Sequence, residues 1–97
     1  MKSKKECIEI LKQSINTVSS KYGVRSMLLF GSVARGEQSD SSDIDILVEM
    51  EPNLFLRSGL KQYLEELLGC NVDVLRHHKN MDTYLLNQIK HDGVSIF

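Results

Sequence analysis

Two aspartates separated by one residue, Asp43 and Asp45, are the side chains in this sequence best placed to do chemistry. They lie in an alternating run in which Ile44, Ile46 and Val48 would point the other way, a pattern typical of a half-buried strand. Side chains two apart on a strand share a face and lie about 6.5–7 Å apart at the backbone. Both carboxylates can therefore reach one divalent cation, and hard oxygen ligands of this kind suit Mg²⁺.

A small, polar turn earlier in the chain is a candidate phosphate site. Gly31 would let the backbone approach a ligand closely, Ser32 offers a hydroxyl, and residues 32–35 would open a helical turn whose free N–H groups face an anion. Arg35 adds a planar fork of donors suited to phosphate oxygens. Ser42, just before the first aspartate, is a further candidate for contact with phosphate or metal. The turn is not a Walker loop, because it lacks the Gly-Lys-Ser/Thr ending.

The stretch LFGSVARGEQSDSSDIDILV resembles the minimal nucleotidyltransferases of the polymerase-beta-type superfamily. Their motif is Gly-Ser, a spacer of roughly ten residues, and Asp-x-Asp on a strand; here residues 33–42 are the spacer. The resemblance extends over essentially the whole chain. It implies a palm-like nucleotidyltransferase fold, a nucleoside triphosphate such as ATP as substrate, and nucleotide contacts from Gly31, Ser32, Arg35 and Ser42.

Asp73, in the run NVDVL, matches a third carboxylate that the family carries on a strand beside the Asp-x-Asp strand. Neighbouring strands lie about 4.8 Å apart, so a same-face Asp73 would complete a three-carboxylate cluster for one or two metals. The resemblance implies catalytic and metal-binding roles for Asp43, Asp45 and Asp73, with two Mg²⁺ ions expected. The alternatives are an outward-facing strand aspartate at 73 and a solvated strand face at 43 and 45.

The elements that must position these residues follow from hydrophobic periodicity and turn signals. In chain order they are a helix at 3–21, a strand at 24–30, a strand at 43–49 closed by Pro52, a leucine-striped helix ending at Gly69, a strand at 71–76, a helix capped by Asn80, and a short strand at 93–97. The predicted fold class is α/β. We expect a small mixed, twisted sheet of about four strands, with helices mainly on one face and the aspartates on the other.

Composition restricts the class of protein. The 97 residues support one compact domain, 1–97, and the net charge of −1 argues against long DNA or RNA as a substrate. Cys7 and Cys70 lack metal or disulfide spacing, so we expect reduced thiols in a cytoplasmic protein. The sequence has no apolar run of about 18 residues, which argues against membrane insertion and secretion.

The predicted function is Mg²⁺-dependent transfer of a nucleoside monophosphate to a hydroxyl. Proteins of the family that this chain resembles are commonly antitoxins that add AMP to a tyrosine of a HEPN-domain toxin, so the resemblance implies such a partner. The chain could form a homo-oligomer or a hetero-oligomer with it. Two alternatives stay open: a non-catalytic antitoxin or regulatory subunit that neutralises its partner by binding alone, and a structural subunit whose site has decayed.

Overall fold

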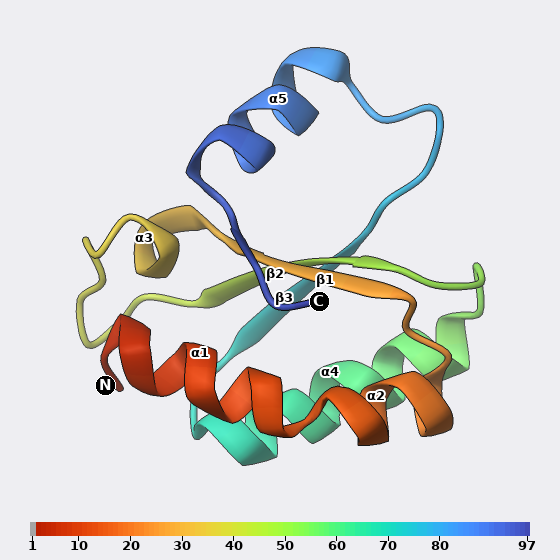
Figure 1. Cartoon of the computed structure of the whole chain (residues 1–97), viewed down its shortest axis with the longest axis horizontal. Helices are drawn as coiled ribbons and strands as arrows, with labels where there is room; N and C mark the ends of the chain where they lie inside the picture. Colours follow the sequence, from red (N-terminus) through yellow and green to blue (C-terminus); the bar gives the residue numbers. More distant parts are fainter. Residues whose placement is uncertain (1) are drawn as a thin grey trace.

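The structure, a computed structural model, describes residues 2–97 and shows a four-stranded mixed sheet (Figure 1). Its elements are α1 (Lys4–Gln13), α2 (Ile15–Tyr22), β1 (Ser26–Phe30), α3 (Gly31–Ala34), β2 (Ile44–Glu49), α4 (Leu54–Leu68), β3 (Val72–Arg76), α5 (Thr83–Asp92) and β4 (Val94–Ser95). The strand order is β3-β2-β1-β4. β1 pairs antiparallel with β2 and β4, whereas β2 and β3 are parallel. The predicted α/β class and mixed sheet are confirmed.

The hydrophobic core lies between the sheet and the helices α1, α2 and α4, which cover one face (Figure 1). Ile44, Ile46 and Val48 of β2 are fully buried there, together with Leu60 and Leu64 of α4. Because side chains alternate along a strand, burial of these three residues directs the aspartates of the same segment to the opposite face. The alternation predicted for β2 is therefore confirmed.

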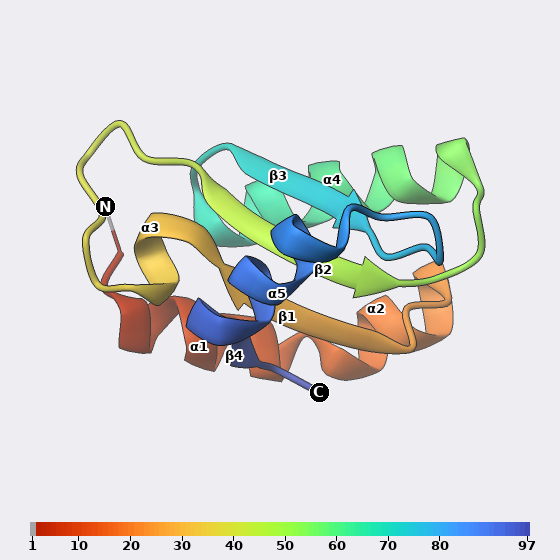
Figure 2. The same cartoon turned by 90° about the horizontal axis from the view of Figure 1, so that it is seen from above.

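One helix, α5, lies on the aspartate side of the sheet. Figures 1 and 2 show it across the sheet from the other long helices, and it packs near β1 and α3. Ile89 of α5 and Leu47 of β2 are both buried. α5 therefore partly covers the aspartate face. From the sequence we expected helices mainly on the other face, without an expectation of which helix would lie here.

The predicted helix at 3–21 is wrong in one respect, because the structure breaks it into α1 and α2 at Ser14. Ser14 is buried, and its Oγ donates a hydrogen bond to the carbonyl of Leu11 at 2.6 Å. A serine side chain that bonds to a nearby backbone carbonyl competes with the helical ladder, which accounts for the break. The predicted apolar stripe is retained, since Leu11 and Val18 are fully buried.

The N-cap predicted for the last helix is also wrong. Asp82, and not Asn80, caps α5, and its carboxylate accepts a hydrogen bond from the Leu85 N–H at 3.0 Å. Asn80 lies in the preceding turn. Both residue types cap helices well, so position relative to the first helical turn decides between them. The end of α4 is as predicted, with Gly69 in the left-handed conformation.

A polar clamp fixes α4 to the edge strand β3. Lys61 and Glu65 form an ion pair, with Nζ and Oε2 2.8 Å apart. Lys61 Nζ also donates to the Val72 carbonyl at 2.8 Å, and Glu65 Oε2 accepts from the Val72 N–H at 3.1 Å. Since Val72 lies on the unpaired edge of the sheet, these bonds satisfy backbone groups that would otherwise face solvent.

Both cysteines are free thiols, Cys7 fully buried and Cys70 partly buried. Burial of Cys7 agrees with its place on the apolar stripe of the first helix. In residues 2–97, no helix combines the length and apolar content needed to cross a membrane.

Candidate active site

Strand pairing brings the predicted site residues together at one end of the sheet. Phe30 of β1 is the register partner of Asp45 on one side, and Asp73 of β3 is its partner on the other. Register partners on neighbouring strands point to the same face of a sheet. Asp45 is half-buried and Asp73 is exposed on the face opposite Ile44 and Ile46. The expectation that Asp73 shares a face with Asp45 is met.

The turn at Gly31 lies directly against Asp45. Gly31 follows the last residue of β1 and has φ +78°, the left-handed region that side chains strain. A Cβ added at this position would overlap the Asp45 carboxylate. Glycine is therefore required at this position for two reasons: the positive φ of the backbone, and the lack of space beside the Asp45 carboxylate. The two halves of the sequence motif meet at this contact.

Asp45 is the electrostatic centre of the site. Burial raises the pKa of the Asp45 carboxyl, and the carboxylates of Asp73 and Asp43 raise it further, while Arg35 opposes them. Like charges and partial burial both disfavour the ionised form of a carboxyl group. A bound cation would reverse both effects, so the arrangement favours a positively charged ligand at Asp45.

Arg35 lies between α3 and α5, held by two carboxylates. Its Nε donates to Glu37 Oε2 at 3.1 Å, and its Nη1 lies 3.8 Å from Asp92 Oδ2 at the end of α5. The guanidinium is close enough to lower the pKa of Asp45. Arg35 is therefore near the place where phosphate is expected, but it shares its donors with α5 and the following loop.

The loop before β2 contains the remaining predicted residues. Asp43 is exposed and lies one position before the strand, so no strand pairing fixes it. Ser42 Oγ accepts a hydrogen bond from the Ser39 N–H at 2.8 Å, and Ser42 N–H donates to the Ser39 carbonyl at 3.0 Å. The Ser42 hydroxyl thus shapes this turn, and its contact with nucleotide stays a prediction. Asp40 lies in the same turn.

A hollow of about 230 Å³ opens beside the Gly31 turn. It is lined by residues of the turn and of α5: Phe30, Gly31, Arg35, Leu85, Gln88, Ile89 and Asp92. Its walls are mostly apolar, with one amide and one ion pair at the rim. A site of this kind can hold a planar ring next to the charged groups.

Residues 11–96 match the nucleotidyltransferase domain family. The chain belongs to this family. A Methanocaldococcus jannaschii protein provisionally named a protein adenylyltransferase is 40% identical over 100 residues, which cover 99% of this chain and 100% of that protein. The protein adenylyltransferase MntA of Thermococcus cleftensis is 42% identical over 72 residues, which cover 72% of this chain and 73% of MntA.

A solved structure gives the same assignment. One chain of a crystal structure of a toxin-antitoxin with AMP-PNP superposes on this nucleotidyltransferase with a TM-score of 0.70 and 27% identity, covering 89% of this chain and 72% of that one. The family match and the adenylyltransferase relatives identify the chain as an enzyme of the nucleotidyltransferase class. The resemblance drawn from the Gly-Ser and Asp-x-Asp motif is confirmed.

The family implies a nucleoside triphosphate substrate and a divalent cation, and the donor set of this nucleotidyltransferase fits such a cation. Asp45 and Asp73 present hard carboxylate oxygens from paired strand positions. Within residues 2–97, no three His, Cys, Asp or Glu side chains form a group that could hold a metal ion, so the expected cluster of three carboxylates is not assembled in this structure. Asp43 precedes β2 and takes no part in the strand pairing, so the three carboxylates do not enclose a cation on all sides. Mg²⁺ commonly uses one or two carboxylates and completes its shell with water and phosphate oxygens, so an open set suits it.

Two residues near the site were missed in the sequence. Asp92 pairs with Arg35, and Gln88 lines the hollow beside Gly31. Both belong to α5, whose periodicity predicts a helix but not the face of the sheet on which it packs. The sequence contains no local signal for either role, because each depends on how α5 crosses β1.

Proposed function

We propose that this nucleotidyltransferase moves AMP from ATP to a tyrosine hydroxyl of a HEPN-domain toxin, in a Mg²⁺-dependent reaction, and so acts as its antitoxin. The observation that carries the proposal is the position of Asp45, which has Asp73 on the adjacent strand and the Gly31 turn against its carboxylate. Support comes from relatives named protein adenylyltransferases and from the similar chain in a toxin-antitoxin crystal structure with AMP-PNP.

Each site residue has a distinct part in this proposal. The backbone at Gly31 and the hydroxyl of Ser32 bind the outer phosphates, and Arg35 neutralises part of their charge. Asp43 and Asp45 would hold Mg²⁺, and one oxygen of Asp73 would be a further ligand while the other stays free to accept a proton. Bound Mg²⁺ supplies charge neutralisation at the phosphates and at the leaving pyrophosphate.

The transfer is an in-line displacement at the α-phosphorus of ATP. The tyrosine oxygen forms a new bond to phosphorus, and the bond from phosphorus to the bridging oxygen breaks, so that pyrophosphate leaves with the electron pair. In our proposal the Asp73 carboxylate takes the hydroxyl proton, because Asp73 is exposed on the same face as Asp45. The exposed position gives a protein acceptor room to approach.

The consequence for the toxin follows from charge. An adenylylated tyrosine adds a bulky anion beside a site that must bind RNA phosphates, so repulsion and occlusion both oppose substrate entry. The formal net charge of −1 on this chain agrees with a protein acceptor, because polynucleotide binding depends on positive surface charge.

The test incubates a HEPN-domain toxin encoded beside this chain with a catalytic amount of the chain, ATP and Mg²⁺. The expected result is one or more adenylyl groups on the toxin by intact-mass spectrometry, with loss of ribonuclease activity. Asp45→Asn should lower the transfer rate by on the order of 100-fold or more, because it removes a carboxylate ligand from the Mg²⁺ that would neutralise the reacting phosphates.

The matched control is Glu66→Gln, which removes one negative charge from an exposed position on α4. It should transfer at the normal rate. If Asp45→Asn neutralises the toxin only at equimolar amounts and no wild-type reaction adds mass, the chain acts by binding alone and the transferase proposal for this toxin is wrong.

A further inference from the structure

The outer edge of β3 is only partly covered. β3 is an edge strand of the sheet. The backbone N–H and carbonyl groups of its successive residues point alternately toward β2 and toward the open edge. Lys61 and Glu65 of α4 bind the Val72 carbonyl and N–H, so the backbone groups of Val72 point toward the open edge. By the alternation, the backbone groups of Val74 and Arg76 point the same way. In residues 2–97 no hydrogen bond reaches the backbone N–H or carbonyl of Val74. A short stretch of open strand edge therefore lies beside α4.

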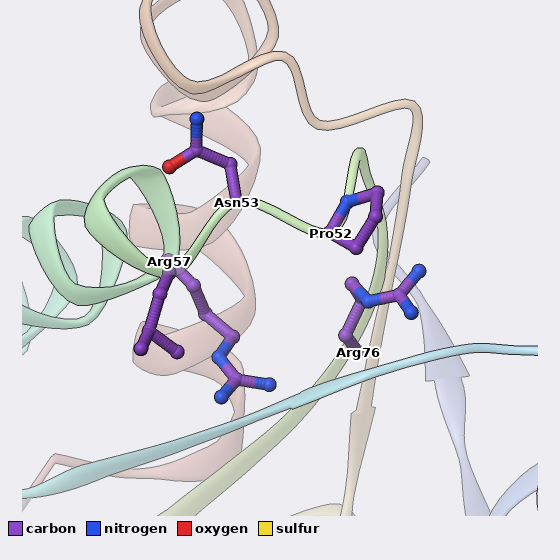
Figure 3. Close-up of a pocket in the computed structure, with 5 residues that line it drawn as sticks. Pro52, Asn53, Arg57 and Arg76 are labelled. Carbon is purple, nitrogen blue, oxygen red and sulfur yellow. The ribbon is translucent and has the colours of Figure 1, made fainter.

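Two hollows follow this edge and share Arg57 of α4. One, of about 390 Å³, is lined by Arg57, Ser58, Lys61, Asp73, Val74 and Leu75. The other, of about 250 Å³, is lined by Pro52, Asn53, Leu54, Arg57 and Arg76 (Figure 3). Together they form a groove along β3, which we call the β3 groove. It runs from Asp73 at one end of the strand to Arg76 at the other.

The groove carries uncompensated positive charge. Arg57 and Arg76 are both half-buried, and in the described residues neither pairs with a carboxylate. Arg76 Nη1 makes only two long contacts, to the carbonyls of Met50 and His77 at 3.4 Å. Half-buried guanidinium groups gain most from a bound oxyanion, because a carboxylate can accept two parallel hydrogen bonds.

Apolar side chains flank the Arg76 end of the groove. Leu54 is 68% exposed and Phe55 is 91% exposed at the start of α4. Leu54 lines the same hollow as the two arginines, and arginine beside exposed apolar side chains is typical of protein interfaces and unlike a pocket for a free inorganic ion. The open backbone at Val74 adds main-chain hydrogen bonding, which an extended segment can use by adding as a strand.

We propose that the β3 groove binds an extended acidic segment of a partner protein. The segment adds as a strand along β3, pairs its backbone with Val74, and places a carboxylate between Arg57 and Arg76. This inference goes beyond the transferase reaction, because Arg57 and Arg76 share a hollow that no aspartate lines. Asp73 is the one site residue that also borders the groove, at its far end.

The test uses a synthetic probe, the peptide acetyl-Thr-Val-Glu-Val-Glu-Val-Thr-amide, titrated into the ¹⁵N-labelled full chain. The expected result is a saturable shift and slowed exchange of the Val74 and Arg76 amides. The double variant Arg57→Gln with Arg76→Gln should bind about tenfold more weakly, since charge-assisted hydrogen bonds are lost. A peptide with lysine in place of both glutamates should not bind.

Two variants that each add one negative charge to α4 test whether peptide binding depends on the groove or on α4 in general. Ser58→Glu places a negative charge among the groove residues, and Gln62→Glu places one on an exposed position outside them. Ser58→Glu should weaken peptide binding, and Gln62→Glu should not. The proposal is overturned if Val74 shows no saturable shift, if the lysine peptide binds equally, or if the double arginine variant binds as the wild type does. None of these outcomes depends on AMP transfer, which the Asp45→Asn assay tests separately.

Discussion

The two ends of β3 gather charges of opposite sign on opposite faces of the sheet. At one end, Asp73 lies beside Asp45 on the face that α5 partly covers. At the other end, Arg76 shares a hollow with Arg57 of α4. Like charges brought together cost stability unless a counter-charge binds. Both places therefore indicate recognition of an ion or a charged group, but only the first belongs to the motif of a nucleotidyltransferase.

The two clusters also differ in how they are held. The aspartates depend on strand register and on a glycine contact, so small displacements should matter for chemistry. The arginines reach a shallow groove on long side chains, so their effect should be on affinity alone. Three measurements test this difference, in decreasing order of expected effect.

Gly31→Ala should have the largest effect. The added Cβ overlaps the Asp45 carboxylate, and a displacement of about 1 Å at a reacting group can cost on the order of 100-fold in rate. The matched control is Gly36→Ala, which has a similar φ of +73° but nothing within 4 Å of the added Cβ. Gly36→Ala should cost only the backbone strain, about 1–2 kcal/mol. Transfer rates and urea unfolding of both variants are the measurements, and equal loss of transfer in the two would contradict a special role for the Asp45 contact.

Addition of Mg²⁺ should raise the Tm through the aspartates and not through the arginines. At one hundred times the dissociation constant the stabilisation is about 2.7 kcal/mol, a shift of several degrees in a chain of this size. The shift should shrink strongly in Asp45→Asn and stay complete in Arg57→Gln. Differential scanning calorimetry with MgCl₂ and with EDTA makes the measurement. A full shift in Asp45→Asn would place the cation elsewhere.

The smallest effect is a pH-dependent gain in stability. The pKa of Asp45 is raised above its usual 3.8, so the folded state holds this proton more tightly than the unfolded state does. Stability is then lost as pH rises from the unfolded value through the raised folded value. In EDTA at pH 7, Asp45→Asn should be more stable than wild type by up to about 1 kcal/mol. Urea titrations should show this difference disappearing below about pH 3.5, where the carboxyl is protonated in both states; a difference that persists there has another cause.

The site was predictable because its main signals are local. Asp43 and Asp45 are two residues apart on an alternating strand, so residue type and periodicity were enough to select them. Gly31-Ser32 was selected as a small polar turn and by the spacing of the family that the sequence resembles. The same-face position of Asp73 followed from the short connection and from the resemblance. The fold class followed from the order of helices and strands.

What was missed depends on packing between distant segments. The position of α5 over the aspartate face, and with it the Arg35–Asp92 pair, is set by how Ile89 fits the sheet. The break at Ser14 depends on a buried hydroxyl bonding within its own helix. The pairing of Arg57 with Arg76 around one hollow joins α4 to β3, and neither residue stands out in its own segment.

Because Gly31 lies against the Asp45 carboxylate, the residues that are tolerated at positions 31 and 45 depend on each other. While an aspartate occupies position 45, a side chain at 31 must displace it, so selection for activity also maintains the glycine. A descendant that lost the aspartate would lose this constraint, and asparagine or aspartate could then occupy position 31, since these residues tolerate the left-handed backbone. A residue other than glycine at position 31 of a related sequence therefore indicates that the contact with Asp45, and with it the transfer site, has been lost.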